Sequence, residues 1–128
     1  MKNNFSDSLI ANDGSRFESR TLRLDVRLPW YRSLPLSVVE PSTLTVDGRA
    51  IPLGDAELEL EGRRYPLREL GGRTDAWWFI QDSAYLHIPL SEAPSGGTHD
   101  VALVLNLYPP YIPMLTWVTR GTAQIRAD

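Results

Sequence analysis

The sequence has no cysteine and only two histidines, His87 and His99, in 128 residues. Without cysteine, the chain has no disulfide, zinc–thiolate site, iron–sulfur cluster or thiol nucleophile. A formal net charge of −3, from 13 basic and 16 acidic residues, disfavours a nucleic-acid binder. No apolar run approaches the roughly 18 residues of a membrane span, and the polar segment 1–8 does not resemble a signal peptide. We therefore expect a cytoplasmic protein that contacts neither nucleic acid nor membrane.

Ten prolines and nine glycines divide the chain into short segments, none of which shows the periodicity of a helix. Between Ser15 and Leu28, apolar and charged residues alternate, which indicates a strand with one buried and one solvated face. Asp47-Gly48 and Glu61-Gly62 are typical turns of two β-hairpins. Residues 94–97 form a loop, and further strands are expected at 76–80, 84–88, 101–107, 114–119 and 122–126.

Two of these expected strands are strongly apolar. Residues 76–80 are apolar at every position, which predicts a strand covered on both faces, and residues 101–107 form the most buried strand, with Leu103 and Leu105 in the core. About eight or nine short strands with regularly spaced turns indicate an all-β fold, an antiparallel β-sandwich or jelly roll. The sequence predicts a single domain over residues 1–128, in which residues 1–12 form an edge strand or a loose arm.

The residues that usually carry catalysis are sparse and scattered. His87 and His99 are twelve positions apart, and we interpret them as a strand-face histidine and a turn histidine rather than a metal site. Glu57 and Glu59 lie on one solvated strand face. The sequence contains neither a Gly-x-Ser-x-Gly elbow nor a glycine-rich phosphate loop. We assign no catalytic residue and no metal ligand to this chain.

Aromatic residues held between prolines are the features that point to recognition. Residues 27–37 present Trp30, Tyr31 and Arg32 between two prolines, and residues 107–113 present Tyr108 and Tyr111 among three. Tyr, Trp and Arg dominate protein–protein hot spots and stack on sugars and aryl rings. Both loops therefore predict contacts with a partner or a substrate. The alternative is structural: Trp30 and Tyr31 plug one end of the sandwich, and the tyrosine of the second loop is a buried corner residue.

A third aromatic segment is Trp77-Trp78-Phe79-Ile80-Gln81-Asp82. Because successive strand residues face opposite sides, one tryptophan is expected in the core and the other against a partner or a covering loop.

The run Arg27-Leu-Pro-Trp-Tyr-Arg-Ser-Leu-Pro-Leu-Ser37, together with Val46-Asp47-Gly48, Trp77-Trp78-Phe79 and Pro110-Tyr111-Ile112, resembles the small β-subunits of C-glycoside deglycosidases. The likeness extends from about Phe17 to about Ile112. Its most specific part is the run 27–37, and the other pieces are short.

This resemblance implies a partner and a division of labour. In that family a TIM-barrel α-subunit, similar to sugar-phosphate isomerases and epimerases, pairs with a small β-sandwich. The complex cleaves the carbon–carbon bond between a 3-oxo sugar and an aromatic aglycone such as a flavonoid. The cleavage resembles a lyase step, in which a metal stabilises an enediolate. The metal, usually manganese, and the acid–base residues belong to the α-subunit, while the β-subunit supports the complex and covers its active site.

Two other functions are compatible with the residues. One is a stand-alone carbohydrate- or aryl-glycoside-binding module that stacks its ligand on Trp30, Tyr31, Tyr111 and an exposed tryptophan. The other is an independent jelly-roll enzyme, which the two separated histidines disfavour.

Overall fold

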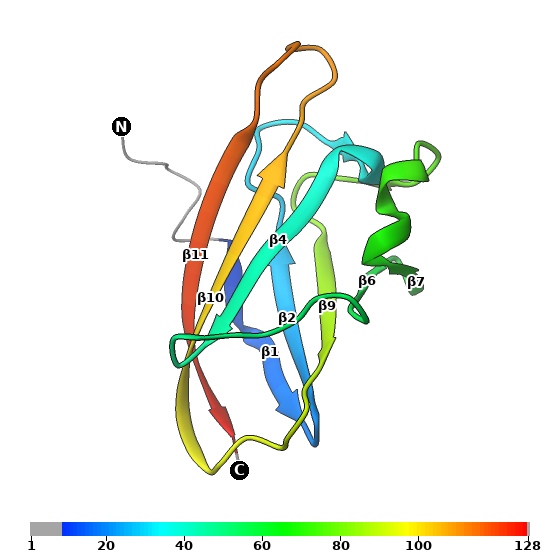
Figure 1. Ribbon diagram of the computed structural model, residues 1–128. Helices are drawn as coiled ribbons and strands as arrows, with labels where there is room; N and C mark the ends of the chain where they lie inside the picture. Colours follow the sequence, from blue (N-terminus) through cyan, green and yellow to red (C-terminus); the bar gives the residue numbers. More distant parts are fainter. Residues whose placement is uncertain (1–8, 128) are drawn as a thin grey trace.

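The computed structural model describes residues 9–127, so most of the predicted N-terminal arm lies outside the described residues. Within them the chain forms eleven β-strands and two short 3-10 helices, and no helix is long and apolar enough to cross a membrane (Figure 1). The elements are β1 Ile10–Glu18, β2 Thr21–Arg27, β3 Leu34–Pro35, η2 Leu36–Val38, β4 Val39–Val46, β5 Arg49–Ala50, β6 Glu57–Leu60, β7 Arg63–Pro66, η3 Leu67–Gly72, β8 Trp77–Trp78, β9 Ser83–Pro89, β10 Gly97–Leu107 and β11 Trp117–Ala127. Strands β3, β5 and β8 have only two residues each, which explains why the sequence predicts fewer strands.

The strands form two facing antiparallel sheets (Figure 1). One has five strands in the order β1-β2-β9-β6-β7, and the other has four in the order β11-β10-β4-β5, while β3 and β8 form a separate pair. Strand β1, at the edge of the first sheet, also contacts β11 at the edge of the second. The predicted all-β sandwich is confirmed.

Apolar residues at alternate positions of the long strands form the core between the sheets. Leu22 and Leu24 of β2, Leu86 of β9, and Leu103 and Leu105 of β10 are at most 1% exposed. Each such side chain contributes roughly 1.5–3 kcal/mol of burial free energy. The period-two pattern that predicts these strands therefore also identifies the residues that stabilise them.

Both predicted hairpin turns are present. Asp47 and Gly48 have φ angles of 51° and 79°, and Glu61 and Gly62 have angles of 52° and 79°. Positive φ at both central residues is typical of a type I′ turn, whose twist matches that of the flanking strands.

The predicted covered strand at 76–80 is wrong. Only Trp77 and Trp78 pair, opposite Pro35 and Leu34 of β3, and the chain then turns at Gln81, which has a φ of 78°. Trp78 is fully buried and Trp77 is 46% exposed, as expected for neighbours on a strand. The rest of the apolar run, residues 79–80, is exposed because β3 provides only a two-residue partner.

The final strand is continuous, although the sequence predicts two strands at 114–119 and 122–126. Strand β11 starts at Trp117 and continues through Gly121. A Cβ on Gly121 would lie 2.7 Å from the Cβ of Leu9, a fully buried side chain packed against β11. This glycine therefore marks a close approach and does not end the strand.

One residue predicted on the solvated face of β2 is buried. Asp25 is 5% exposed, because an irregularity of β1 between Ala11 and Arg16 covers it. The Ser15 hydroxyl accepts a hydrogen bond from the Asp25 backbone N–H at 2.9 Å, and Arg27 Nε lies 3.4 Å from Asp25 Oδ1. The β1 irregularity, which the alternation in β2 does not reveal, is the cause of this burial.

Leu105→Ala is expected to lower the free energy of unfolding by about 2–5 kcal/mol, because it leaves a cavity between two fixed sheets. Val118→Ala, at a position that is 54% exposed, is the control and is expected to cost less than about 1 kcal/mol. Chemical denaturation of both variants measures the difference. A loss of stability below about 0.5 kcal/mol for Leu105→Ala would contradict its placement in the core.

Gly121→Ala is expected to destabilise the chain by about 1–3 kcal/mol, because the new methyl group overlaps Leu9. Gly96→Ala has open space around it and is expected to be neutral or stabilising by up to about 1 kcal/mol. Thermal melts of the two variants therefore separate steric crowding from a general effect of replacing glycine.

Candidate partner-binding surface

The two proline-bounded loops predicted for recognition meet at one end of the sandwich. One joins β2 to β3 and the other joins β10 to β11, and both lie at the top of Figure 1. We call the surface formed by Trp30, Tyr31, Arg32, Phe79, Ile80, Tyr111, Met114 and Trp117 the aromatic end.

Trp30 forms the base of the aromatic end. Its side chain is buried, with 6% of its surface exposed, and its Nε1–H donates a hydrogen bond to the Tyr111 hydroxyl. Its ring packs edge-on against Trp117, with centroids 5.3 Å apart, and tilted against Tyr31 at 5.0 Å. The indole plugs the end of the sandwich and links the two loops, which fits the structural alternative for Trp30. Its contact with a partner or a substrate stays a prediction.

Tyr31, Arg32 and Tyr111 lie outside this base and face solvent. Tyr31 is 57% exposed and Tyr111 is 43% exposed. The Arg32 guanidinium lies 5.0 Å from the centroid of the Tyr111 ring, a cation–π distance. A hydrogen bond with the Tyr111 hydroxyl, together with desolvation, raises the pKa of Tyr31 above 10.0, so this hydroxyl stays neutral at physiological pH. These three residues present flat rings, hydroxyl groups and one cation to solvent.

Phe79 and Ile80, which belong to the third aromatic segment, extend this surface, although the sequence does not predict either of them as a contact residue. They are 51% and 46% exposed, and Ile80 N–H donates to the Ser33 hydroxyl at 2.9 Å, which fixes the segment beside Arg32. Met114, in the β10–β11 loop, is fully exposed. The signal available in the sequence was the apolar run 76–80, but the same run is also compatible with a buried strand.

Tyr108 is not part of this cluster. Its hydroxyl donates to Glu40 Oε1 at 2.6 Å, and Asn106 Nδ2 donates to the same oxygen at 3.2 Å. The hydrogen bond with Glu40 and desolvation raise the pKa of Tyr108. The ring lines a cavity of about 460 Å³ between β4 and η3, with Arg68 on its wall. The second loop thus presents its two tyrosines at different places.

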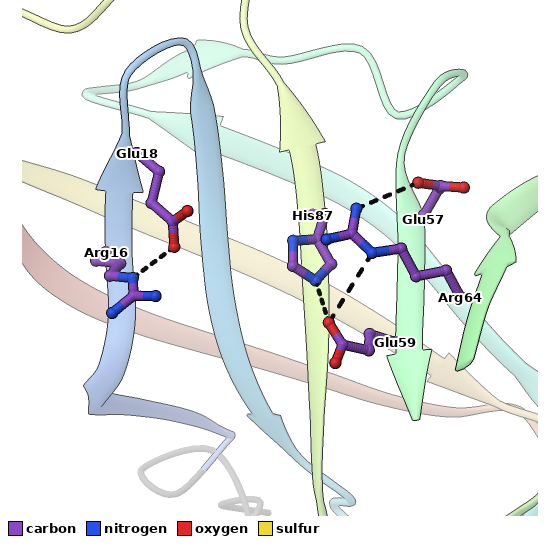
Figure 2. Close-up of polar contacts among 6 residues, drawn as sticks. All are labelled: Arg16, Glu18, Glu57, Glu59, Arg64 and His87. Carbon is purple, nitrogen blue, oxygen red and sulfur yellow. Dashed lines mark hydrogen bonds and ion pairs between the residues drawn. The ribbon is translucent and has the colours of Figure 1, made fainter. Parts of the chain in front are cut away.

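The charged residues of the five-stranded sheet form ion pairs on its outer face (Figure 2). His87 Nε2 lies 2.8 Å from Glu59 Oε1, and Arg64 lies 3.5 Å from Glu57 and 4.0 Å from Glu59. Arg16 pairs with Glu18 on the same sheet. The predicted strand-face position of His87 and the solvated face for Glu57 and Glu59 are confirmed.

His99 does not lie in a turn as predicted. It is inside β10 and is 8% exposed, because the β9–β10 loop and Phe17 cover its ring. Since His87 and His99 belong to different sheets, they cannot share a site. Among residues 9–127, no group of three His, Asp or Glu side chains could hold a metal ion. That the chain itself carries no metal stays a prediction.

The fold and this surface define a class, a small antiparallel β-sandwich with exposed aromatic residues at one end. The family model described as "C-glycoside deglycosidase beta subunit" matches residues 4–111, which include both proline-bounded loops up to Tyr111. The chain therefore belongs to the family of C-glycoside deglycosidase beta subunits.

Curated relatives agree with this assignment. A C-glycoside deglycosidase beta subunit of Microbacterium trichothecenolyticum is 37% identical over 106 residues, which cover 83% of this chain and 80% of the relative. A 3'-dehydrocarminate deglycosidase beta subunit of a Microbacterium species is 37% identical over 109 residues, 84% of this chain and 76% of the relative. A C-glycoside deglycosidase beta subunit of Arthrobacter globiformis is 36% identical over 102 residues, which cover 79% of this chain and 77% of the relative.

Tyr111→Phe is expected to lower the free energy of unfolding by about 1–3 kcal/mol, because the buried Trp30 indole loses its hydrogen-bond acceptor. Denaturation monitored by tryptophan fluorescence measures this loss. Tyr85→Phe is the control, because the Arg23 guanidinium stacked 4.0 Å from the Tyr85 ring stays in place. Equal stability of the Tyr111→Phe and Tyr85→Phe variants would contradict a structural role for the hydroxyl.

Proposed function

We propose that this chain is the supporting subunit of a complex that cleaves the carbon–carbon bond of 3-oxo-C-glycosides. Its partner is a TIM-barrel α-subunit similar to sugar-phosphate isomerases and epimerases, and the β-subunit helps to cover the active site of that partner. Membership of the beta-subunit family and the sequence resemblance support this function. The lyase chemistry, with an aromatic aglycone such as a flavonoid as leaving group, takes place in the α-subunit.

The proposed division of labour comes from the family resemblance, and the side chains of the described residues are compatible with it. The described residues offer no cluster of metal ligands, and the two histidines are engaged with Glu59 and Asp47 in separate sheets. As the resemblance implies, a divalent metal such as manganese, which would polarise the 3-oxo group and stabilise an enediolate, is proposed to belong to the α-subunit. What this chain contributes is a rigid surface.

The observation that carries the proposal is the aromatic end. Tyr31, Arg32 and Tyr111 are exposed, yet their loops are fixed by prolines and by the Trp30 hydrogen bond. Preorganised aromatic and arginine side chains lose little entropy on binding and supply most of the energy of many interfaces. We propose that these residues contact the α-subunit or the substrate it holds. Tyr108, bound to Glu40 nearby, is the remaining candidate contact.

The same surface supports a second function, a stand-alone carbohydrate- or aryl-glycoside-binding module. Its exposed rings could stack on a sugar or an aryl group without a partner subunit. Titration of the isolated chain with an aryl C-glycoside distinguishes the two functions, since binding by the chain alone would favour the module.

Co-expression with an α-subunit of the family, followed by size analysis and an assay on a 3-oxo-C-glycoside, tests the main proposal. We expect a hetero-oligomer that cleaves the substrate and isolated chains that do not. Cleavage by this chain alone, or the absence of any stable complex, would reject the subunit function.

Arg32→Ala is expected to weaken assembly or cleavage more than tenfold, which corresponds to about 1.4 kcal/mol, and to leave the Tm of the isolated chain nearly unchanged. Arg126→Ala is the matched control, because Arg126 is exposed on β11 at the opposite end of the sandwich. A variant Arg32→Ala chain that melts early, yet assembles and supports cleavage normally, would show that Arg32 is structural.

A further inference from the structure

His99 bridges two elements at the end of the sandwich opposite the aromatic end. Its Nδ1 lies 2.6 Å from Asp47 Oδ2 in the β4–β5 turn, and its Nε2 lies 2.6 Å from the Ser95 carbonyl oxygen in the β9–β10 loop. Phe17 of β1 packs edge-on against the ring, with centroids 5.4 Å apart. One imidazole thus joins a turn of the four-stranded sheet to the loop that connects the two sheets.

Both neighbours of the ring are hydrogen-bond acceptors. A carboxylate and a carbonyl oxygen cannot donate, so both bonds form only when both ring nitrogens carry a proton. The Asp47 carboxylate, the Ser95 carbonyl and the nearby charge of Asp100 raise the pKa of His99 above 6.5. In return, the bond with His99 lowers the pKa of Asp47. Arg49 and Glu92 line the cavity beside the ring and complete its charged surroundings.

The hydrogen bonds of His99 with Asp47 and with Ser95 respond differently when the imidazolium loses a proton. Asp47 is fixed independently, since its N–H donates to the Asp100 carbonyl at 2.7 Å and its Oδ1 accepts from the Asp100 N–H at 2.9 Å. A charged carboxylate is also the stronger acceptor, so the remaining proton stays on Nδ1. The Ser95 carbonyl would then face the lone pair of Nε2, which is a repulsive contact.

The loop is able to respond to this loss. Its start is anchored, because Leu90 N–H donates to the Arg20 carbonyl at 2.7 Å and Arg20 Nη2 donates to the Ser91 carbonyl at 2.6 Å. Its other end passes through Gly96 and Gly97, and Gly97 has a φ of 108°, a conformation that favours glycine. Behind it lies a cavity of about 470 Å³ with Val46 and Ile51 among its apolar walls.

We propose that His99 is a pH-sensitive latch, which as an imidazolium holds the β9–β10 loop in place and on losing its proton releases Ser95 and frees the loop that forms one wall of this cavity. The direction follows from linkage. The stabilisation is fully present below about pH 6.5 and is lost as the pH rises through the raised pKa of folded His99. The latch is independent of the subunit function proposed above.

The test is an NMR titration of the uniformly ¹⁵N-labelled full chain, in which the histidine ring nitrogens and the backbone amides are both observed. Below about pH 6.5 we expect both ring nitrogens of His99 to be protonated, with the titration midpoint above that value. Backbone order parameters of residues 93–96 should fall from about 0.85 to below about 0.6 as the pH passes this midpoint, while those of β10 stay constant. A neutral His99 ring at low pH, or a loop whose order does not change across the midpoint, would overturn the latch.

Asp47→Asn is the decisive variant, since asparagine accepts the positive φ of this turn position but lacks the charge. We expect its His99 midpoint to fall by at least one pH unit, a tenfold change in proton affinity, and the pH of loop release to fall with it. His99→Gln should leave the loop mobile at every pH. His87→Gln is the control and should leave the loop transition unchanged. A shifted transition in this variant would show that His87, and not His99, controls the loop.

Discussion

The hydrogen bond from the Trp30 indole to the Tyr111 hydroxyl is the interaction on which the proposed binding surface depends. It joins two loops that are far apart in the sequence and belong to different sheets. Because the indole also packs on Trp117, at the start of β11, the loops are fixed to the strands that carry them. The exposed rings of Tyr31 and Tyr111 can therefore be both accessible and rigid, a combination that loops without a buried anchor rarely achieve.

In the proposed complex, this anchoring gives the chain a role that requires no catalytic residue of its own. In the proposed function, a supporting subunit needs a surface of fixed shape and few ionisable groups beside the active site that it is proposed to cover. At the aromatic end the proposed surface carries one guanidinium group, that of Arg32, which lies over the Tyr111 ring. A surface of this composition can cover an active site without adding a competing acid or base.

Local chemistry could be predicted from the sequence wherever one segment determines the outcome. Asp47-Gly48 forms its type I′ turn because the two residues tolerate positive φ, and Leu103 and Leu105 are buried because the strand alternates. The aromatic residues of both loops were also found, since prolines on either side indicate rigid exposed turns. The contacts between these residues could not be predicted, because the hydrogen bond between Trp30 and Tyr111 depends on how the two sheets face each other.

The wrong predictions share a physical cause. Contact with another segment of the chain, or the lack of such contact, decides whether a residue is buried and where a strand ends. Gly121 looks like a strand end but is required by Leu9, which packs where a side chain would be. Asp25 is expected on a solvated face but lies beneath the β1 irregularity, and the β9–β10 loop, which the strand alternation does not describe, covers His99. Residues 79–80 look buried but lack a strand to cover them. Each case depends on tertiary contacts that periodicity does not encode.

Strand β10 spans both ends of the molecule, from His99 near its start to Leu107 at the aromatic end. At about 3.3 Å per residue, the two regions are separated by roughly 25 Å or more along the strand. This distance exceeds the screening length of about 8 Å at physiological ionic strength, so the charge of His99 has little direct effect on Arg32. The strand between them is paired on both sides, with β4 and β11, and is therefore a stiff element. Loop release at one end can leave the binding surface at the other unchanged, and one small sandwich can carry two devices that act separately.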